Sequence, residues 1–65
     1  KAVLLGAVMK LKEKNRIVVQ LYYYEGDSVK EIAEILRIKE TTVQTRLMRA
    51  RNALREIVKE DWLNE

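Results

Sequence analysis

Apolar residues recur at three- and four-residue intervals along most of the chain, which is the spacing of helices that bury one face. The longest stripe advances by about 100° per residue and consists of Val43, Leu47, Ala50, Leu54 and then Ile57 or Val58. It predicts a helix of ~18 residues that begins near Glu40 or Thr41. We expect the acidic residues 60–65 to fray, with Trp62 close enough to the stripe to dock.

The first half of the chain predicts two shorter helices. Residues 2–10 show helical apolar spacing through Leu4, Leu5, Val8 and Met9. A second helix is expected from Lys12 to Tyr24, with an apolar stripe made of Ile17, Val18, Leu21 and Tyr22. It should stop at Glu25-Gly26, because glycine readily takes the left-handed conformation that ends helices.

A capping box marks the start of another helix at Ser28. The Ser28 hydroxyl can accept a hydrogen bond from the amide three residues on, while Glu31 reaches back to the amide of Ser28. The apolar face that follows consists of Ile32, Ala33, Ile35 and Leu36, and the register breaks after Leu36. The sequence therefore predicts an all-α fold, a small bundle of about four helices.

The last two helices have the spacing of a helix-turn-helix, over roughly residues 28–52. A capped helix of about eight residues, a connector of about four and a longer helix are typical of this motif. Ala33 is the small residue where the two helices meet, and the contacts that lock their angle would come from Ile32, Leu36, Ile38, Val43 and Leu47. The alternative is an ordinary helical hairpin, which has no need of a cationic second helix.

Charge supports the helix-turn-helix, because it is localised rather than large. The net charge is only +3. Residues 37–55 nevertheless carry six Lys or Arg and one Glu, whereas the last ten residues carry one Lys and four acids. Four arginines between 46 and 55 with no acid among them are unusual on a merely solvated face, where the signs alternate. This block is the electrostatic footprint expected of a nucleic-acid surface.

Turning the apolar stripe inward leaves a polar face that could read DNA bases in the major groove. Gln44 can pair with adenine, Arg49 with guanine, and Thr45 or Met48 can touch a thymine methyl, while Arg46 and Arg51 on the flanks reach phosphates. Thr41 and Asn52 share this outward face. For any single arginine a solvated surface is the alternative, and Met48 fits a protein contact as well as a groove contact.

The composition excludes several other kinds of functional site. With no Cys and no His, the chain has no thiolate or imidazole for zinc, disulfides or acid-base catalysis. We therefore expect no enzyme, no metal and no cofactor. The opening apolar run is far shorter than the ~20 residues of a membrane span, so we expect a cytoplasmic protein. Residues 1–65 should form one DNA-binding domain, and the Lys at position 1 suggests a piece of a longer chain.

Two further groups of residues keep open interpretations. The run Tyr22-Tyr23-Tyr24 cannot all point inward from one helix, so Tyr22 would lie partly in the core and the others would cover it or stack on a ligand. Lys10, Lys12, Lys14 and Arg16 form a solvated face, unless Arg16 or Lys14 touches the DNA backbone.

The chain resembles region 4 of bacterial sigma factors of the sigma-70 family, in particular the extracytoplasmic-function type. The resemblance rests on residues 11–26, on 28–36 and most specifically on 42–51, Thr-Val-Gln-Thr-Arg-Leu-Met-Arg-Ala-Arg. It implies recognition of the minus-35 promoter element by the last helix and docking on the β flap of RNA polymerase, with an anti-sigma factor as a further partner. By matching position, the implied DNA-binding residues are Gln44, Thr45, Arg46, Met48 and Arg49, with Arg16 and Tyr23 as weaker candidates. Lys39 and Thr41, at the start of the last helix, complete the set of candidate DNA-binding residues.

Three positions depart from the family pattern. Lys12 stands where Pro usually begins the second helix, and Lys39 stands where Ser usually caps the last one, unless Thr41 or Thr42 takes over the cap. Arg37 stands where a glycine often makes the turn, so either Arg37 adopts a left-handed backbone or the turn differs. The rival functions are a dimeric helix-turn-helix regulator that acts without polymerase, and a protein-interaction module that grips its partner through Leu4, Leu5, Val8 and the Met48 face.

Overall fold

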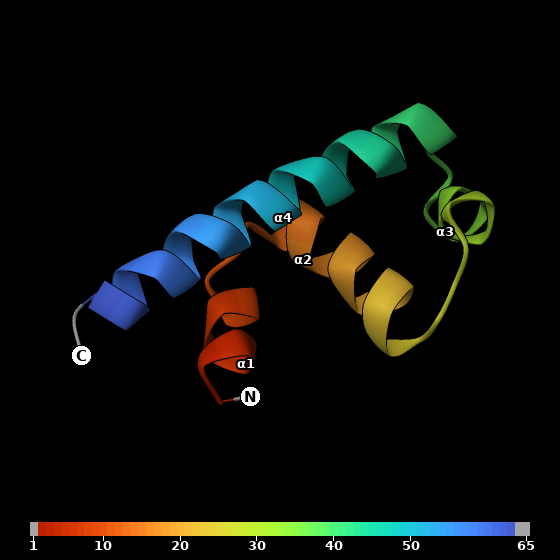
Figure 1. Cartoon of the computed structure of the whole chain (residues 1–65). Helices are drawn as coiled ribbons and strands as arrows, with labels where there is room; N and C mark the ends of the chain where they lie inside the picture. The colour runs from red at the N-terminus through yellow and green to blue at the C-terminus, as the bar shows by residue number, and fades with distance from the viewer. Residues whose placement is uncertain (1, 64–65) are drawn as a thin grey trace.

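The computed structural model describes the backbone of residues 2–63 and the side chains of residues 6–59. The elements are α1 (Ala2–Met9), α2 (Glu13–Val19), the π-helix η1 (Gln20–Tyr24), α3 (Val29–Leu36) and α4 (Glu40–Leu63). Figure 1 shows α4 running along one side of the molecule, with α1, α2 and α3 packed beneath it. The predicted all-α fold is confirmed, since these residues contain no strand.

One apolar core joins all four α-helices. Its fully buried side chains include Val18 from α2, Ile32 from α3 and Val43 from α4. Burying a side chain of this size contributes about 1.5–3 kcal/mol. The other buried residues are Ala7, Val8, Leu11, Val19, Ala33, Leu47 and Ala50. Because α3 and α4 share this core with α2, their relative orientation is fixed by packing as well as by the short turn between them.

The second predicted helix is interrupted by a change in helical type. It starts at Glu13 and becomes a π-helix over Gln20–Tyr24, where the Glu25 amide donates to the Gln20 carbonyl, five residues back, at 3.0 Å. A π-turn contains more residues than an α-turn, so the side chains lag behind the 100° rotation that the sequence analysis assumed. Tyr22, which belongs to the π-helix, is 38% exposed, and Val19, the last residue of α2, is buried although it lay outside the predicted stripe.

Both ends of the loop between η1 and α3 follow the sequence signals. Gly26 has a left-handed φ of +76°, as the predicted helix stop requires. The Ser28 hydroxyl accepts from the Glu31 amide at 3.1 Å, and the Glu31 carboxylate accepts from the Ser28 amide at 2.8 Å. The capping box is thus confirmed, and these hydrogen bonds from the Ser28 backbone and side chain hold the pKa of Glu31 below its ordinary value.

One residue of the predicted apolar face of α3 points away from the core. Ile32 and Ala33 are buried and Leu36 packs against the core, but Ile35 is 56% exposed. At 100° per residue, Ile32, Leu36 and Ala33 fall within an arc of about 100°, and Ile35 lies about 60° outside it. The prediction for Ile35 was wrong because the core covers only that narrow arc.

The turn between α3 and α4 keeps its usual form despite the missing glycine. Arg37 takes the left-handed conformation, with φ 57° and ψ 47°. The Ile38 amide then donates to the Ala33 carbonyl at 3.0 Å, and Ile38 packs against the core. This combination of a left-handed residue, a backward hydrogen bond and an apolar contact is a Schellman motif. The chain therefore tolerates an unfavourable backbone at Arg37 to preserve the turn.

The last helix is longer than predicted. It begins at Glu40, as expected, but has 24 residues and extends to Leu63, so the expected fraying was wrong for residues 60–63. No Gly or Pro follows Gly26, and Lys, Glu, Arg and Ala favour helix. The expected docking of Trp62, like the positions of the Leu4 and Leu5 side chains, lies outside the described side chains. None of the described helices combines the length and apolar character needed to cross a membrane.

Candidate nucleic-acid interface

Helix α4 turns its apolar stripe inward and its candidate base-reading side chains outward. Val43, Leu47 and Ala50 are at most 3% exposed. The outward side chains split by exposure: Lys39, Thr41, Gln44, Met48 and Arg49 are exposed, whereas Thr45 and Arg46 are half-buried. Met48 is 50% exposed, which leaves it accessible to a groove or to a protein. The inner face therefore holds the helix rigidly while the outer face stays free.

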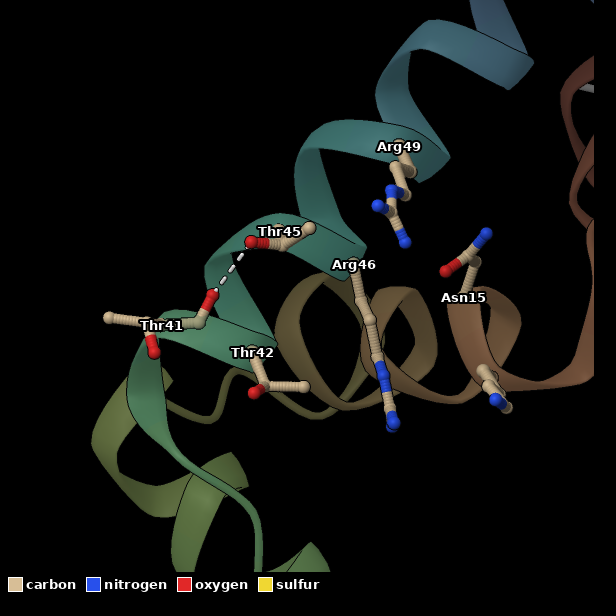
Figure 2. A pocket seen from close by; sticks show the side chains of 7 residues that line it. Asn15, Thr41, Thr42, Thr45, Arg46 and Arg49 are labelled. Carbon is tan, nitrogen blue, oxygen red and sulfur yellow. Dashed lines mark hydrogen bonds between the residues drawn. The ribbon is translucent and has the colours of Figure 1, made fainter.

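A hollow lies between the start of α2 and the first half of α4. We call it the basic hollow, and its volume is about 280 Å³. Figure 2 shows Arg46 and Arg49 extending from α4 toward the side where Asn15 projects from α2. The lining residues are Lys14, Asn15, Thr41, Thr42, Thr45, Arg46 and Arg49. The structure thus brings four of the candidate DNA-binding residues together with two polar residues of a different helix.

The cations of the basic hollow are not neutralised by partners. Lys14, Arg46 and Arg49 form no hydrogen bond or ion pair with any described residue. Glu13 lines two other hollows, one shared with Arg46 and the other with Arg49, but it does not line the basic hollow. Charges of one sign that converge without a counterion attract anions most strongly where a cavity focuses their field. The basic hollow therefore suits an anion such as a phosphate.

The first turn of α4 is held by backbone bonds and by one threonine. The Lys39 carbonyl accepts from the amides of Thr42 and Val43 at 3.0 and 3.1 Å, which places Lys39 at the N-cap position. Neither Thr41 nor Thr42 supplies the missing side-chain cap among the described contacts. The Thr45 hydroxyl instead donates to the Thr41 carbonyl at 2.9 Å (Figure 2). The hydroxyl hydrogen of Thr45 is therefore already engaged with the backbone of α4.

Two sequence candidates lie away from the basic hollow. Arg16 is half-buried and donates to the Met9 carbonyl at 3.4 Å, so it extends toward the end of α1. Tyr23 accepts a 3.4 Å hydrogen bond from Arg51, and its ring meets that of Tyr22 edge-on, with the centroids 4.9 Å apart. The structure therefore separates Arg16 and Tyr23 from the group around Arg46 and Arg49.

Tyr23 belongs to a second surface, which we call the apolar groove. It is lined by Val8, Val19, Tyr23, Tyr24, Arg51 and Leu54. Two residues along an α-helix correspond to about 200° of rotation, so Arg49 and Arg51 lie on nearly opposite sides of α4. Tyr23 and Tyr24 are 54% and 58% exposed. The molecule thus carries a polar, cationic surface and an aromatic surface on different flanks of one helix.

Asn15 and Thr42 were not among the predicted DNA-binding residues, and the sequence left open whether Lys14 contacts the DNA backbone. The sequence pattern identifies Lys14 and Asn15 as polar positions on α2. The spacing of polar residues along one helix does not reveal which other helix lies beside them. The packing of α2 on α4 through Val18 and Val43 is what brings them beside Arg46 and Arg49.

Comparison with known proteins identifies the family to which the chain is similar. Residues 1–54 match the protein family described as Sigma-70, region 4. The chain is also similar to the ECF RNA polymerase sigma factor SigW of Bacillus subtilis (strain 168), with 47% identity over 49 residues, which cover 75% of this chain and 26% of the relative. The match to that relative thus spans about a quarter of its length. The family match includes α1, α2, η1, α3 and the part of α4 that ends at residue 54.

Proposed function

Because the chain belongs to the sigma-70 region 4 family, whose members are DNA-binding transcription factor domains rather than enzymes, we propose that it recognises the minus-35 element of a promoter. The first half of α4 enters the major groove, and the flanking cations hold the phosphates. The observation that carries this proposal is the opposition on α4 of a buried Val43-Leu47-Ala50 face and an exposed, cationic, amide-bearing face.

Each outward side chain has a role set by its chemistry. Gln44 pairs with an adenine and Arg49 with a guanine, because an amide and a guanidinium form bidentate hydrogen bonds to those base edges. Met48 and the Thr45 methyl contact thymine methyl groups. Arg46, with Lys39 and Thr41 at the start of α4, binds the sugar-phosphate backbone and sets the register of the helix in the groove.

A salt titration tests DNA binding itself. The binding of a fluorescent duplex, followed by anisotropy, should weaken with a log-log slope of roughly −3.6 if about four phosphates are neutralised. A duplex selected from a random pool by this chain provides the specific target, and a scrambled duplex of equal length is its control. A flat salt response, or equal affinity for the selected and scrambled duplexes, would contradict the proposal.

Single variants separate base reading from phosphate binding. Arg49→Ala should cost about 1–3 kcal/mol on the selected duplex and relax discrimination at one base pair. A variant such as Lys59→Ala removes one exposed charge near the far end of α4 and should leave discrimination unchanged. A uniform loss over all sequences in Arg49→Ala would instead mark Arg49 as a phosphate contact.

The apolar groove is the surface we propose for RNA polymerase, through the β flap. Its exposed Tyr23 and Tyr24 rings and the side chains of Val8 and Leu54 suit an apolar segment of a partner protein, since aromatic residues are enriched at interfaces. Tyr24→Ala should weaken binding of core polymerase in a pull-down and leave duplex binding intact. An anti-sigma factor, if this chain has one, should compete with polymerase for the same groove.

A further inference from the structure

We propose that Lys14 and Asn15 of α2, together with Arg46 of α4, form a binding site for one backbone phosphate of the duplex. This inference rests on the proposed DNA binding and adds to it a contact outside the helix-turn-helix. Lys14, Asn15 and Arg46 line the basic hollow from two helices that are far apart in sequence, and Arg49, which we assign to a base, lines its other part.

The geometry of the basic hollow matches a phosphodiester. Arg46 extends from α4 and Asn15 from α2 (Figure 2), and Lys14 of α2 lines the same hollow, so an anion held there meets donors from both helices. A guanidinium offers a fork of N–H groups to two phosphate oxygens, while an ammonium acts as a compact point charge. Asn15 adds an uncharged amide donor. Thr42, also in the lining, adds a hydroxyl.

The electrostatics of the free chain point to the same ligand. No described carboxylate pairs with Lys14, Arg46 or Arg49, so the three positive charges repel one another until an anion enters. The duplex supplies such anions in a regular array along each strand. Because α2 is anchored in the core by Val18 and Val19, a phosphate held at its first turn would also fix how α4 lies in the groove.

The site has a consequence for sequence recognition. Lys14 and Asn15 lie off the outward face of α4 and contact the backbone, which carries no sequence information directly. Their loss should therefore weaken binding to all duplexes alike, in contrast to the loss of Gln44 or Arg49.

The test combines a charge change in the protein with one in the DNA. Lys14→Ala should lower affinity for the selected duplex about five- to tenfold at 0.1 M salt and reduce the salt slope by about 0.9, the share of one phosphate. Lys14→Arg should keep most of the affinity. Asn15→Asp, which sets a carboxylate against the phosphate, should bind more weakly than Asn15→Ala. Lys59→Ala is the control for a lost charge outside the hollow.

Methylphosphonate substitution then locates the phosphate. Neutral linkages are placed one at a time along the selected duplex. One position should weaken wild-type binding and have a clearly smaller effect on Lys14→Ala, because the Lys14 contribution to that phosphate contact is already lost. Thermal unfolding of each variant, followed by circular dichroism, verifies that the fold is intact.

The outcomes separate this inference from the proposed function. If the wild type binds duplex DNA with a steep salt slope but Lys14→Ala binds equally well, or couples to no methylphosphonate position, the phosphate site is refuted and DNA binding stands. If Lys14→Ala loses binding of inorganic phosphate yet keeps wild-type affinity for the duplex, the anion is not the DNA backbone and the inference is equally refuted. A wild type that binds no duplex overturns both.

Discussion

Arg37 provides the sharpest test of how the helix-turn-helix is built, because its backbone is unfavourable for any residue with a Cβ. Its φ of 57° and ψ of 47° lie in the left-handed region, which costs an L-residue about 1–2 kcal/mol. The Arg37 side chain is exposed and forms no hydrogen bond or ion pair with the described residues. Replacing it with glycine therefore removes the backbone cost without removing a native contact.

The expected gain is smaller than the full backbone cost. Glycine also makes the unfolded chain more flexible, which opposes folding by about 0.4–1 kcal/mol. The difference leaves Arg37→Gly more stable by about 0.8 kcal/mol. For a domain of this size, such a change raises Tm by about 3–6 °C.

Two control variants isolate the cause. Arg37→Ala removes the same charge and side chain but keeps the Cβ, so it should melt no higher than the wild type. Arg37→Asn should fall between Ala and Gly, because asparagine tolerates the left-handed region better than most residues. Thermal and urea unfolding, followed by far-UV circular dichroism, measure all four proteins. If Gly and Ala raise Tm equally, the gain comes from the lost charge and the backbone argument is refuted.

Three further changes test the capping, the entry to α2 and the core. Ser28→Ala should destabilise the chain by about 0.5–2 kcal/mol. Because the pKa of Glu31 is lowered in the folded chain from 4.5, its contribution is present above that pH and lost as pH falls through the lowered pKa. Acid titration of unfolding should show this loss in the wild type and not in Glu31→Gln, which has no carboxylate to protonate. Lys12→Pro should raise stability by about 0.4–1 kcal/mol in urea unfolding, since its φ of −59° already suits proline; a lower midpoint would show that the ring clashes. Ile32→Ala should cost about 2–5 kcal/mol, whereas a cost below that of Ile32→Val would contradict its full burial.

The elements that sequence analysis placed correctly have local chemical signals. Ser28 and Glu31 encode a helix start in four residues, and Gly26 encodes a stop, because each acts on its own backbone neighbours. The apolar stripe through Val43 and Leu47 can also be recognised from the sequence, since a helix that buries one face repeats its apolar residues at a fixed angle. These signals were sufficient to predict which side of α4 faces outward.

The features that sequence analysis missed depend on contacts between elements. The π-turn over Gln20–Tyr24 shifts the direction of Tyr22, and a pattern search that assumes 100° per residue does not detect this change of helical type. Ile35 is as apolar as Ile32, but only the arc of α3 that packs against the other helices is buried, and Ile35 lies outside this arc. Lys14 and Asn15 become part of a site only when α2 packs on α4. In each case the deciding partner lies elsewhere in the chain.

The sequence Arg49-Ala50-Arg51 explains how a single helix can serve two proposed partners. Ala50 is fully buried, and its small side chain lets α4 lie close to the core. The arginines on either side are then directed to opposite flanks, because two residues rotate a helix by about 200°. Arg49 lines the basic hollow with its charge unpaired, whereas Arg51 is tied to the Tyr23 hydroxyl beside the apolar groove. A shift of one residue in the register of α4 would therefore disrupt the proposed DNA and polymerase surfaces together, while a side-chain change on either flank should affect only one.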